Sequence, residues 1–383
     1  MKKSGESVVQ IVGPTDGWVL ENLARKLAEK LPYSEFVPWK MRPGGAARLV
    51  YYVNYALYEK PSGLVDVGFF THLDESQRFL QRARSMDFCV CMSRQYADWL
   101  RAQGVKTVAH IEMGFDSYRY RPRLVLGVVG QLDHPRKGKH LVERLRALPF
   151  VEVRVSDGRL AEKELPAFYE RLDYVLISAT AEGGPMSLLE GLAMGKLVIA
   201  PEGIGMVGEF GDTEQIRRYK AGDAEALVAV VTACFEEKRR RAAIVNGRSW
   251  DAWAEAHHRL FSKLLDERGT ELPKPAPGFR FRMMSELDIP LTADVKTLEA
   301  AVDQASRHLY YGRYAEARAS LETVAPEYPC VRKLIAQLMS SKDQKAGVRG
   351  RPPGASMVKP SPVRTTKSSK VASVRPSHPH PLR

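Results

Sequence analysis

The order of hydrophobic and polar positions divides the first 120 residues into short apolar runs separated by helix-like stretches. Residues 8–12 form one apolar run, which ends in the turn Gly-Pro-Thr-Asp-Gly at 13–17. An amphipathic stretch with apolar positions three or four residues apart follows at 18–31. Further apolar runs lie at 49–53, 67–70, 88–92 and 105–111. Buried strands that alternate with helices predict a parallel sheet covered on both faces.

The same pattern starts again after Tyr-Arg-Pro-Arg at 120–123. Residues 124–130 read Leu-Val-Leu-Gly-Val-Val-Gly, a second buried strand that enters a glycine-containing loop. Further strands are predicted at 151–155, 174–177 and 197–200, with helices between them. We therefore expect an α/β fold with two Rossmann-like domains, one over residues 1–120 and one over residues 121–249.

The remaining third of the chain changes in character. Residues 250–266 have the pattern of an amphipathic helix, and three prolines mark a linker over 267–297. Residues 298–340 resemble a small helical hairpin, in which 310–317 are similar to half of a tetratricopeptide unit. One such unit cannot bury its own apolar face, so we expect it to pack on the main body or on a partner. Residues 341–383 are rich in Pro, Ser, Lys and Arg and are predicted to form a disordered tail.

Composition supports an ordinary globular protein. The chain has 383 residues, enough for two domains, with 44% hydrophobic and 27% charged residues. The net charge of +13 is concentrated in the tail, which contains ten Lys and Arg residues but only one acidic residue, Asp343. Because the other 340 residues are nearly neutral, charge alone does not predict a nucleic-acid-binding fold. The tail could contact an anionic surface, either a nucleic-acid backbone or a membrane, although it lacks aromatic residues for base stacking.

Cysteine usage and the absence of long apolar runs indicate where the protein works. Its four cysteines form no CxxC pair and cannot make a disulfide framework in a chain of this length. No run approaches the roughly 18 apolar residues of a membrane span, and the N-terminal apolar run is too short for a signal peptide. We expect a cytoplasmic protein without a membrane span, with a peripheral membrane contact left open.

The segment 178–200 contains the most informative chemistry. A predicted strand ends in Gly-Gly-Pro at 183–185, and a helix follows. Proline suits the first position of a helix because its missing N–H is not needed there. The backbone N–H groups of Met186, Ser187 and Leu188 are then predicted to point out of the helix start and to bind an anion such as a diphosphate.

Two glutamates flank this helix start. Glu182 precedes it and Glu190 lies inside it, so the sugar and the ribose of a nucleotide diphosphate sugar could each reach one carboxylate. With the surrounding Gly-Gly-Pro, Leu-Leu-Glu-Gly-Leu-Ala-Met-Gly and Leu-Val-Ile-Ala, the pair resembles the E-x7-E signature of retaining glycosyltransferases of the family 4 type. The resemblance implies the GT-B fold, two Rossmann-like domains facing a cleft. It also implies that Glu182 contacts the donor sugar, that Glu190 holds the ribose and that Gly184 lines the donor site. The alternative is two surface glutamates on a loop and a helix.

A second stretch, 127–139, resembles the G-R-x5-K-G motif of the same family. The lysine of the motif falls on Lys137 and its first glycine on Gly130, while Gln131 stands where the family has an arginine. The resemblance implies that Lys137 neutralises the diphosphate. Glutamine removes a fixed charge and a bidentate phosphate donor, and Arg136 or Lys139 is a candidate to replace it.

Weaker resemblances lie in the N-terminal half. His72, in the stretch Phe-Phe-Thr-His-Leu-Asp at 69–74, corresponds to the family's histidine beside the transferred sugar, although a histidine after a strand is also often structural. Gly17 corresponds to a glycine of the first loop that faces the phosphate or the acceptor, and a plain tight turn is the alternative. Residues 111–122 resemble the hinge entry and 249–251 the start of the helix that crosses back to the N-terminal domain. The resemblance covers roughly residues 6–266.

Two other functions compete with this interpretation. Residues 203–208 satisfy G-x-G-x-x-G, which is typical of a nicotinamide dehydrogenase. A true dinucleotide fingerprint opens a helix directly after the first strand of a unit, whereas this motif follows a late strand. A scaffold or binding protein built on an inactive transferase fold is the second alternative, because of Gln131 and the helical appendage.

The resemblance also implies a mechanism. The chain contains no D-x-D motif, so a metal-bound diphosphate has no obvious ligands. We expect metal-independent transfer with retention of the anomeric configuration, and no cofactor besides the nucleotide-sugar donor substrate. The acceptor is open and could be a glycan, a lipid, a protein or a modified nucleic acid.

Overall fold

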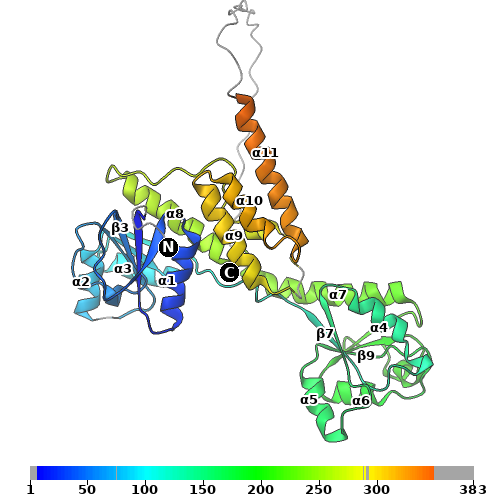
Figure 1. Ribbon diagram of the computed structural model, residues 1–383. Helices are drawn as coiled ribbons and strands as arrows, with labels where there is room; N and C mark the ends of the chain where they lie inside the picture. The colour runs from blue at the N-terminus through cyan, green and yellow to red at the C-terminus, as the bar shows by residue number, and fades with distance from the viewer. Residues whose placement is uncertain (1–6, 75, 288, 290–292, 349–383) are drawn as a thin grey trace, which may run out of the picture. The chain divides into compact units, whose positions relative to one another are not determined.

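The computed structural model describes residues 7–348 except 75, 288 and 290–292, with side chains up to residue 340 (Figure 1). The described residues up to 342 belong to one compact unit, which contains both sheets described below.

The first sheet has the strand order β2-β1-β3-β4-β5-β6, and every pair of neighbours is parallel. Its strands are β1 (Val9–Gly13), β2 (Ser34–Pro38), β3 (Leu49–Tyr52), β4 (Val65–Phe70), β5 (Phe88–Cys91) and β6 (Val108–His110). Helices α1 (Val19–Lys30), α2 (Gln77–Ser85) and α3 (Arg94–Ala102) connect them. All six positions of β4 are buried, as expected for a strand inside a parallel sheet. The sequence pattern missed β2, an edge strand with a mixed polar sequence.

The second sheet has the order β11-β10-β9-β7-β8, also parallel throughout. It consists of β7 (Leu124–Val128), β8 (Val151–Val155), β9 (Tyr174–Leu176), β10 (Leu197–Pro201) and β11 (Ile216–Tyr219). Its helices are α4 (Lys139–Arg146), α5 (Leu165–Glu170), α6 (Met186–Ala193) and α7 (Ala224–Ala242). Two parallel sheets covered by helices confirm the predicted α/β class. The missed strand, β11, is again at an edge and contains two arginines.

Helix α8 (Trp250–Asp266) completes the core of the first sheet. Trp253 and Phe261 are buried on it together with Tyr51 and Phe69 of the strands. The chain then enters the segment expected to be a linker. This segment places Met283 and Met284 in a separate apolar core, so it is packed rather than extended.

Three helices form the appendage, one more than the predicted hairpin. They are α9 (Val295–Tyr310), α10 (Tyr314–Glu322) and α11 (Arg332–Val348), and together with Met283 and Met284 they enclose the apolar core just described. The predicted tail begins at residue 341, but α11 continues to Val348. Residues 349–383 lie outside the described residues.

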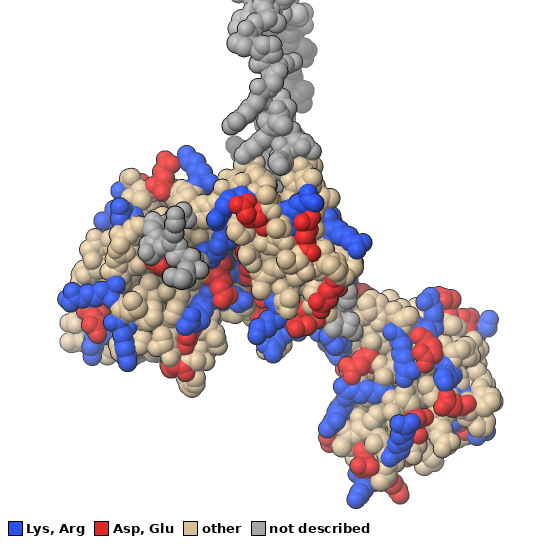
Figure 2. Space-filling model, viewed as in Figure 1, with Lys and Arg blue, Asp and Glu red and all other residues tan. Residues whose placement is uncertain are grey.

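Charges of both signs are interspersed on the face shown in Figure 2. This distribution agrees with the nearly balanced charge of the sequence outside the tail. Among the helices that the structure describes, none is long and apolar enough to cross a membrane.

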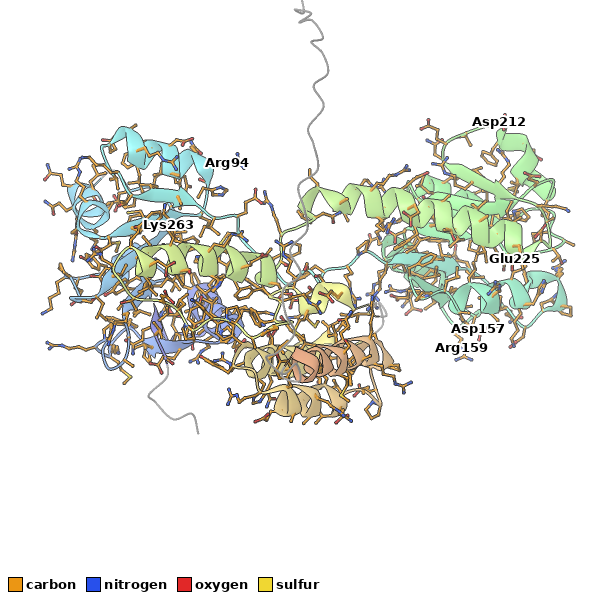
Figure 3. The ribbon with its side chains drawn as sticks, turned by 90° about the horizontal axis from the view of Figure 1, so that it is seen from above. Arg94, Asp157, Arg159, Asp212, Glu225 and Lys263 are labelled. Carbon is orange, nitrogen blue, oxygen red and sulfur yellow. The ribbon has the colours of Figure 1, made fainter. Side chains whose placement is uncertain are left out.

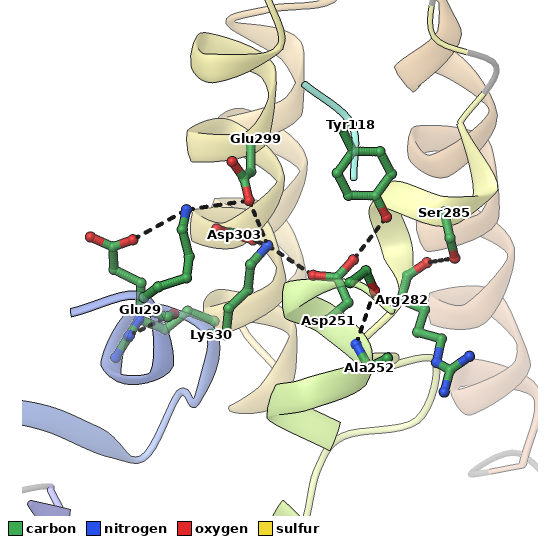
Figure 4. A network of polar contacts seen from close by, with 12 residues as sticks. Glu29, Lys30, Tyr118, Asp251, Ala252, Arg282, Ser285, Glu299 and Asp303 are labelled. Carbon is green, nitrogen blue, oxygen red and sulfur yellow. Dashed lines mark hydrogen bonds and ion pairs between the residues drawn. The ribbon is translucent and has the colours of Figure 1, made fainter. Parts of the chain in front are cut away.

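A buried ion cluster ties the appendage to the first sheet (Figure 4). Lys30 Nζ at the end of α1 lies 2.8 Å from Asp251 of α8, 3.1 Å from Glu299 and 2.7 Å from Asp303 of α9. The side chains of Lys30 and Asp251 are 4% and 2% exposed. Burial opposes the charge on Lys30, but the three carboxylates together raise its pKa well above the usual range. Burial also raises the pKa of Asp303, to about 6.

Replacing Lys30 by methionine is therefore expected to lower the free energy of unfolding by about 3–5 kcal/mol, because it leaves buried carboxylates without their cation. Urea denaturation of the wild type and of Lys30→Met, followed by circular dichroism, measures this difference.

The matched control is Lys26→Met on the same helix. Lys26 is 24% exposed and lies 3.3 Å from Glu299, so its loss should cost only about 0–1 kcal/mol. Equal losses in the two variants would show that the buried cluster does not anchor the appendage.

Candidate functional site

The predicted site residues of the second sheet follow the carboxyl ends of two neighbouring strands. Residues 129–138 follow β7 and residues 177–185 follow β9, and these strands pair in parallel. Because the carboxyl ends of parallel strands meet at one edge, the two loops lie side by side. This edge is where open α/β sheets bind their ligands.

Direct contacts lock the two loops together. Ser178 Oγ donates to the carbonyl of Lys137 at 2.6 Å, and the amide of Thr180 donates to the carbonyl of Arg136 at 2.8 Å. Gly138 has a φ of 68°, and a Cβ at this position would lie 2.0 Å from the Ser178 carbonyl oxygen. Only glycine allows this approach, which fixes the 3-10 turn Pro135–Lys137 against the loop that follows β9.

The locked loops bring Lys137 and Glu182 together. Lys137 Nζ lies 2.5 Å from Glu182 Oε2, and the two side chains are 29% and 14% exposed. The hydrogen bond from Lys137 lowers the pKa of Glu182, and the nearby guanidinium of Arg136 adds a smaller effect in the same direction. Lys137 and Glu182, one candidate residue from each of the two predicted motifs, therefore form one partly buried ion pair.

Helix α6 begins beside this pair, with two differences from the prediction. Pro185 is the N-cap and not the first helical residue, and the helix starts at Met186, without a side chain that caps it. The amide of Leu188 donates to the carbonyl of Pro185 at 2.9 Å, so the prediction of a free amide at Leu188 is wrong. Met186 and Ser187 keep amides without a partner in the described part of the chain. The predicted anion site at this helix start therefore has two amides rather than three.

The G-x-G-x-x-G stretch at 203–208 packs against the loop that contains Glu182. The amide of Met206 donates to the carbonyl of Gly183 at 3.0 Å. Gly205 has a φ of 48°, and a Cβ there would lie 2.1 Å from the same carbonyl oxygen. Residues 205–210 form a 3-10 turn after β10 and not the helix of a dinucleotide fingerprint. The contact between Gly205 and Gly183 therefore fixes the loop of the candidate site. In the same loop, Gly184 lies next to the end of the Met206 side chain.

Glu190 has a partner that sequence reasoning missed. The hydroxyl of Tyr169, from α5, donates to Glu190 Oε2 at 2.5 Å. Burial raises the pKa of Tyr169, and its bond to Glu190 raises it further. This contact holds the Glu190 carboxylate in one orientation. No local sequence signal reveals it, because the two residues are 21 positions apart on different helices.

Gln131 occupies the position of the expected arginine. It is exposed, and its side chain lies against Gly158 in the loop that follows β8. The same loop contains Arg159, whose side chain is 84% exposed and lies 3.2 Å from Asp157 (Figure 3). The amide of Gly130 donates to Ser156 Oγ at 2.9 Å, so this glycine joins β7 to the neighbouring loop.

Of the two cations that could replace the arginine, one is already paired. Lys139 Nζ lies 2.5 Å from Asp133 Oδ1 on the exposed surface. Arg136 forms no ion pair with any residue that the structure describes, and its charge acts on Glu182. Arg136 is therefore the better candidate for the second cation beside Lys137.

His72 and Gly17 belong to the first sheet. His72 follows β4, and its two ring nitrogens lie 3.0 Å from the Tyr55 hydroxyl and 3.1 Å from the Thr71 hydroxyl. The amide of Gly17 donates to Glu21 Oε2 at 2.7 Å. The Gly17 amide is thus bonded to a carboxylate of helix α1, as in the tight turn that was the alternative interpretation. Among the described residues, no group of three or more His, Cys, Asp or Glu side chains could hold a metal ion.

Comparison with protein families identifies part of the chain. A family model described as glycosyl transferases group 1 matches residues 105–250. This part of the chain is similar to group 1 glycosyl transferases. It contains the second sheet and the Lys137–Glu182 pair, so the predicted glycosyltransferase relationship is confirmed there. No curated protein sequence matches the chain.

Several solved structures are similar to the chain at low identity. HepE from Anabaena in complex with UDP is 14% identical, with a TM-score of 0.30 over 67% of this chain and 100% of that one. Sucrose-phosphate synthase from Thermosynechococcus elongatus is 13% identical, with a TM-score of 0.31 over 68% and 100% of the two chains. A glycosyltransferase from Rickettsia africae is 13% identical, with a TM-score of 0.29 over 68% and 99%. The assignment of residues 105–250 rests on the family match.

The approach of Gly138 to Ser178 gives a stability prediction. Gly138→Ala adds a Cβ where a carbonyl oxygen already lies, in a backbone conformation that alanine rarely adopts. The control Gly195→Ala has nearly the same φ, 67°, but its Cβ would meet nothing within 4 Å.

The loss in free energy of unfolding for Gly138→Ala is expected to exceed that for Gly195→Ala by about 1–3 kcal/mol, the usual cost of an added group in a filled space. Urea titrations of both variants measure it. If both lose the same amount, the contact between the two loops is not what requires glycine at position 138.

Proposed function

We propose that this protein is a glycosyltransferase that moves a sugar from a nucleotide diphosphate sugar to an acceptor hydroxyl. The observation that carries the proposal is the Lys137–Glu182 ion pair at the carboxyl edge of the second sheet, inside the segment similar to group 1 glycosyl transferases. A cation, an oriented carboxylate and two amides without a partner among the described residues lie at one edge, and they suit a ligand that combines a diphosphate with a sugar.

Each part of the donor has a corresponding group. The diphosphate lies at the start of α6, where the amides of Met186 and Ser187 and the side chains of Lys137 and Arg136 bind it. The ribose hydroxyls bind Glu190, which Tyr169 holds in place. The hydroxyls of the transferred sugar bind Glu182, in keeping with the family 4 resemblance.

Catalysis in this proposal is electrostatic. The bond between the sugar and the diphosphate breaks as the acceptor oxygen attacks the same sugar carbon, and negative charge grows on the departing diphosphate. Lys137, Arg136 and the amides of α6 are fixed donors that stabilise this charge without reorganisation. Transfer retains the anomeric configuration and needs no metal ion, and the protein acts in the cytoplasm.

The decisive experiment removes the ion pair one residue at a time. Lys137→Ala and Glu182→Ala are each expected to reduce sugar transfer or nucleotide-sugar hydrolysis by about ten-fold or more, the usual loss when a fixed transition-state donor is removed. The wild type is first screened with UDP, GDP, ADP and TDP sugars, and the rates of the variants are then measured with the donor that it uses best. Circular dichroism checks the fold.

Lys139→Ala is the matched control, because Lys139 is an exposed lysine of the same loop region that is already paired with Asp133. Its rate should stay near that of the wild type. Near-normal rates in both test variants would contradict the assigned site. A wild type that neither transfers nor hydrolyses any of these donors would favour the scaffold alternative, which Gln131 and the helices α9–α11 support.

Metal independence has a separate test. Because the proposed diphosphate ligands are a lysine, an arginine and backbone amides, full activity is expected in excess EDTA. The rate with and without the chelator is compared at a fixed donor concentration. Complete loss that added magnesium or manganese restores would refute this part of the proposal.

A further inference from the structure

A pocket of about 500 Å³ lies at the carboxyl edge of the first sheet. Its floor contains Val12 from β1 and Tyr52 from β3, and its walls come from the loops that follow β2 and β3. Strand β1 lies between β2 and β3, so the chain runs from β1 to the strand on one side of it and then crosses to the strand on the other side. This reversal of strand order is where open α/β sheets form their ligand crevice. The pocket lies outside the segment 105–250.

The pocket lining is positively charged. Lys40 and Arg42 come from the first wall and Lys60 from the second, while Glu59 is the acid that opposes them. All three cations are exposed, and none forms an ion pair with a residue that the structure describes. Elsewhere, at the candidate donor site, Lys137 is paired with Glu182. Three unpaired cations around one cavity favour an anionic ligand over a neutral one.

Apolar surface accompanies the charge. Trp39 is 44% exposed and Met41 is 60% exposed, and both line the pocket. Lys40 Nζ lies 5.6 Å from the centre of the Trp39 ring, so the aromatic face and a cation are presented together. This combination suits a ligand that joins an anionic group to a ring or another apolar part.

Both walls are fixed by hydrogen bonds. In the first wall, the amide of Trp39 donates to the carbonyl of Gly13 at 3.0 Å and the amide of Met41 donates to that of Pro38 at 2.8 Å. In the second wall, the amide of Ser62 donates to Asp66 at 2.8 Å.

Asp66 itself is only 2% exposed and also accepts a bond from the Tyr52 hydroxyl at 3.3 Å. A buried carboxylate thus joins the floor of the pocket to its second wall. These hydrogen bonds restrain both walls of the pocket, and a restrained pocket lowers the entropic cost of binding.

We propose that this pocket binds the phosphate group of a phosphate-bearing acceptor. Arg42, Lys60 and Lys40 contact the phosphate, and the Trp39 ring contacts the adjoining ring or apolar part. The assignment of this ligand as an acceptor rests on the glycosyltransferase function proposed above, whereas phosphate binding at the pocket does not. A soluble phosphate ester and a phospholipid headgroup present the same chemistry, and the experiment separates them.

The first arm titrates the ¹⁵N-labelled full-length chain with inorganic phosphate and follows the Trp39 indole signal, which Trp39→Phe identifies. The double variant Arg42→Gln/Lys60→Gln is expected to bind phosphate at this pocket about ten-fold more weakly, because two charge-assisted hydrogen bonds are lost. The matched control is Arg78→Gln/Lys106→Gln. These are also exposed cations without an ion pair among the described residues, but they lie outside the pocket.

The second arm measures co-sedimentation with vesicles of phosphatidylcholine, with and without phosphatidylglycerol. All variants keep the basic residues 341–383, so the contribution of the tail cancels between them. If a phospholipid is the source of the phosphate, the double variant loses binding to the anionic vesicles relative to the control. If the acceptor is soluble, the first arm alone separates the double variant from the control.

No response of the Trp39 signal in the wild type, or equal affinities in the double variant and its control, would overturn the proposal. Hydrolysis of the nucleotide sugar by water is measured in parallel and is expected to be unchanged in the double variant. A wild type that binds phosphate normally here but hydrolyses no nucleotide sugar would remove the transferase function and leave the phosphate site standing.

Discussion

The close approach of two loops on the second sheet is the contact on which the candidate donor site depends. Gly138 lies beneath the carbonyl oxygen of Ser178, in a backbone conformation and a space that exclude a side chain. This contact sets the 3-10 turn that presents Lys137, and it brings the lysine to Glu182. A second glycine, Gly205, lies equally close to the carbonyl oxygen of Gly183, where a side chain would also clash. The ion pair is thus held by backbone geometry and not by long flexible side chains alone.

The two sheets handle charge differently. On the second sheet the cation of the candidate site is matched by a carboxylate of the protein, because Lys137 is paired with Glu182. In the proposed function, a diphosphate competes with Glu182 for Lys137. On the first sheet Lys40, Arg42 and Lys60 have no such partner within the described residues. An ion pair keeps a site ordered when it is empty, whereas unpaired cations attract an anion from a distance. The contrast supports separate tasks for the two carboxyl edges.

The helical appendage belongs to the body of the first sheet through charge as well as apolar contact. Lys30, buried among Asp251, Glu299 and Asp303, joins three helices that are distant in sequence. Such a cluster contributes little net stability compared with an apolar core of the same volume, but its geometry is demanding. It therefore selects one arrangement of α1, α8 and α9 over others.

The sequence by itself determined the interior of both sheets and the helix after Gly-Gly-Pro, and it selected Lys137, Glu182 and Glu190 as candidate site residues. These features are visible because a buried strand or a helix start is encoded by residues adjacent in the chain. Only the tertiary structure revealed the edge strands β2 and β11, whose half-exposed positions give no continuous apolar run. It also decided that Leu188 has no free amide, that Tyr169 orients Glu190 and that Gly205 supports Gly183. Each of the last two is a contact between residues about twenty positions apart. The first exists only once helices α5 and α6 have packed side by side, and the second only once the parallel strands β9 and β10 have brought the loops after them to the same edge.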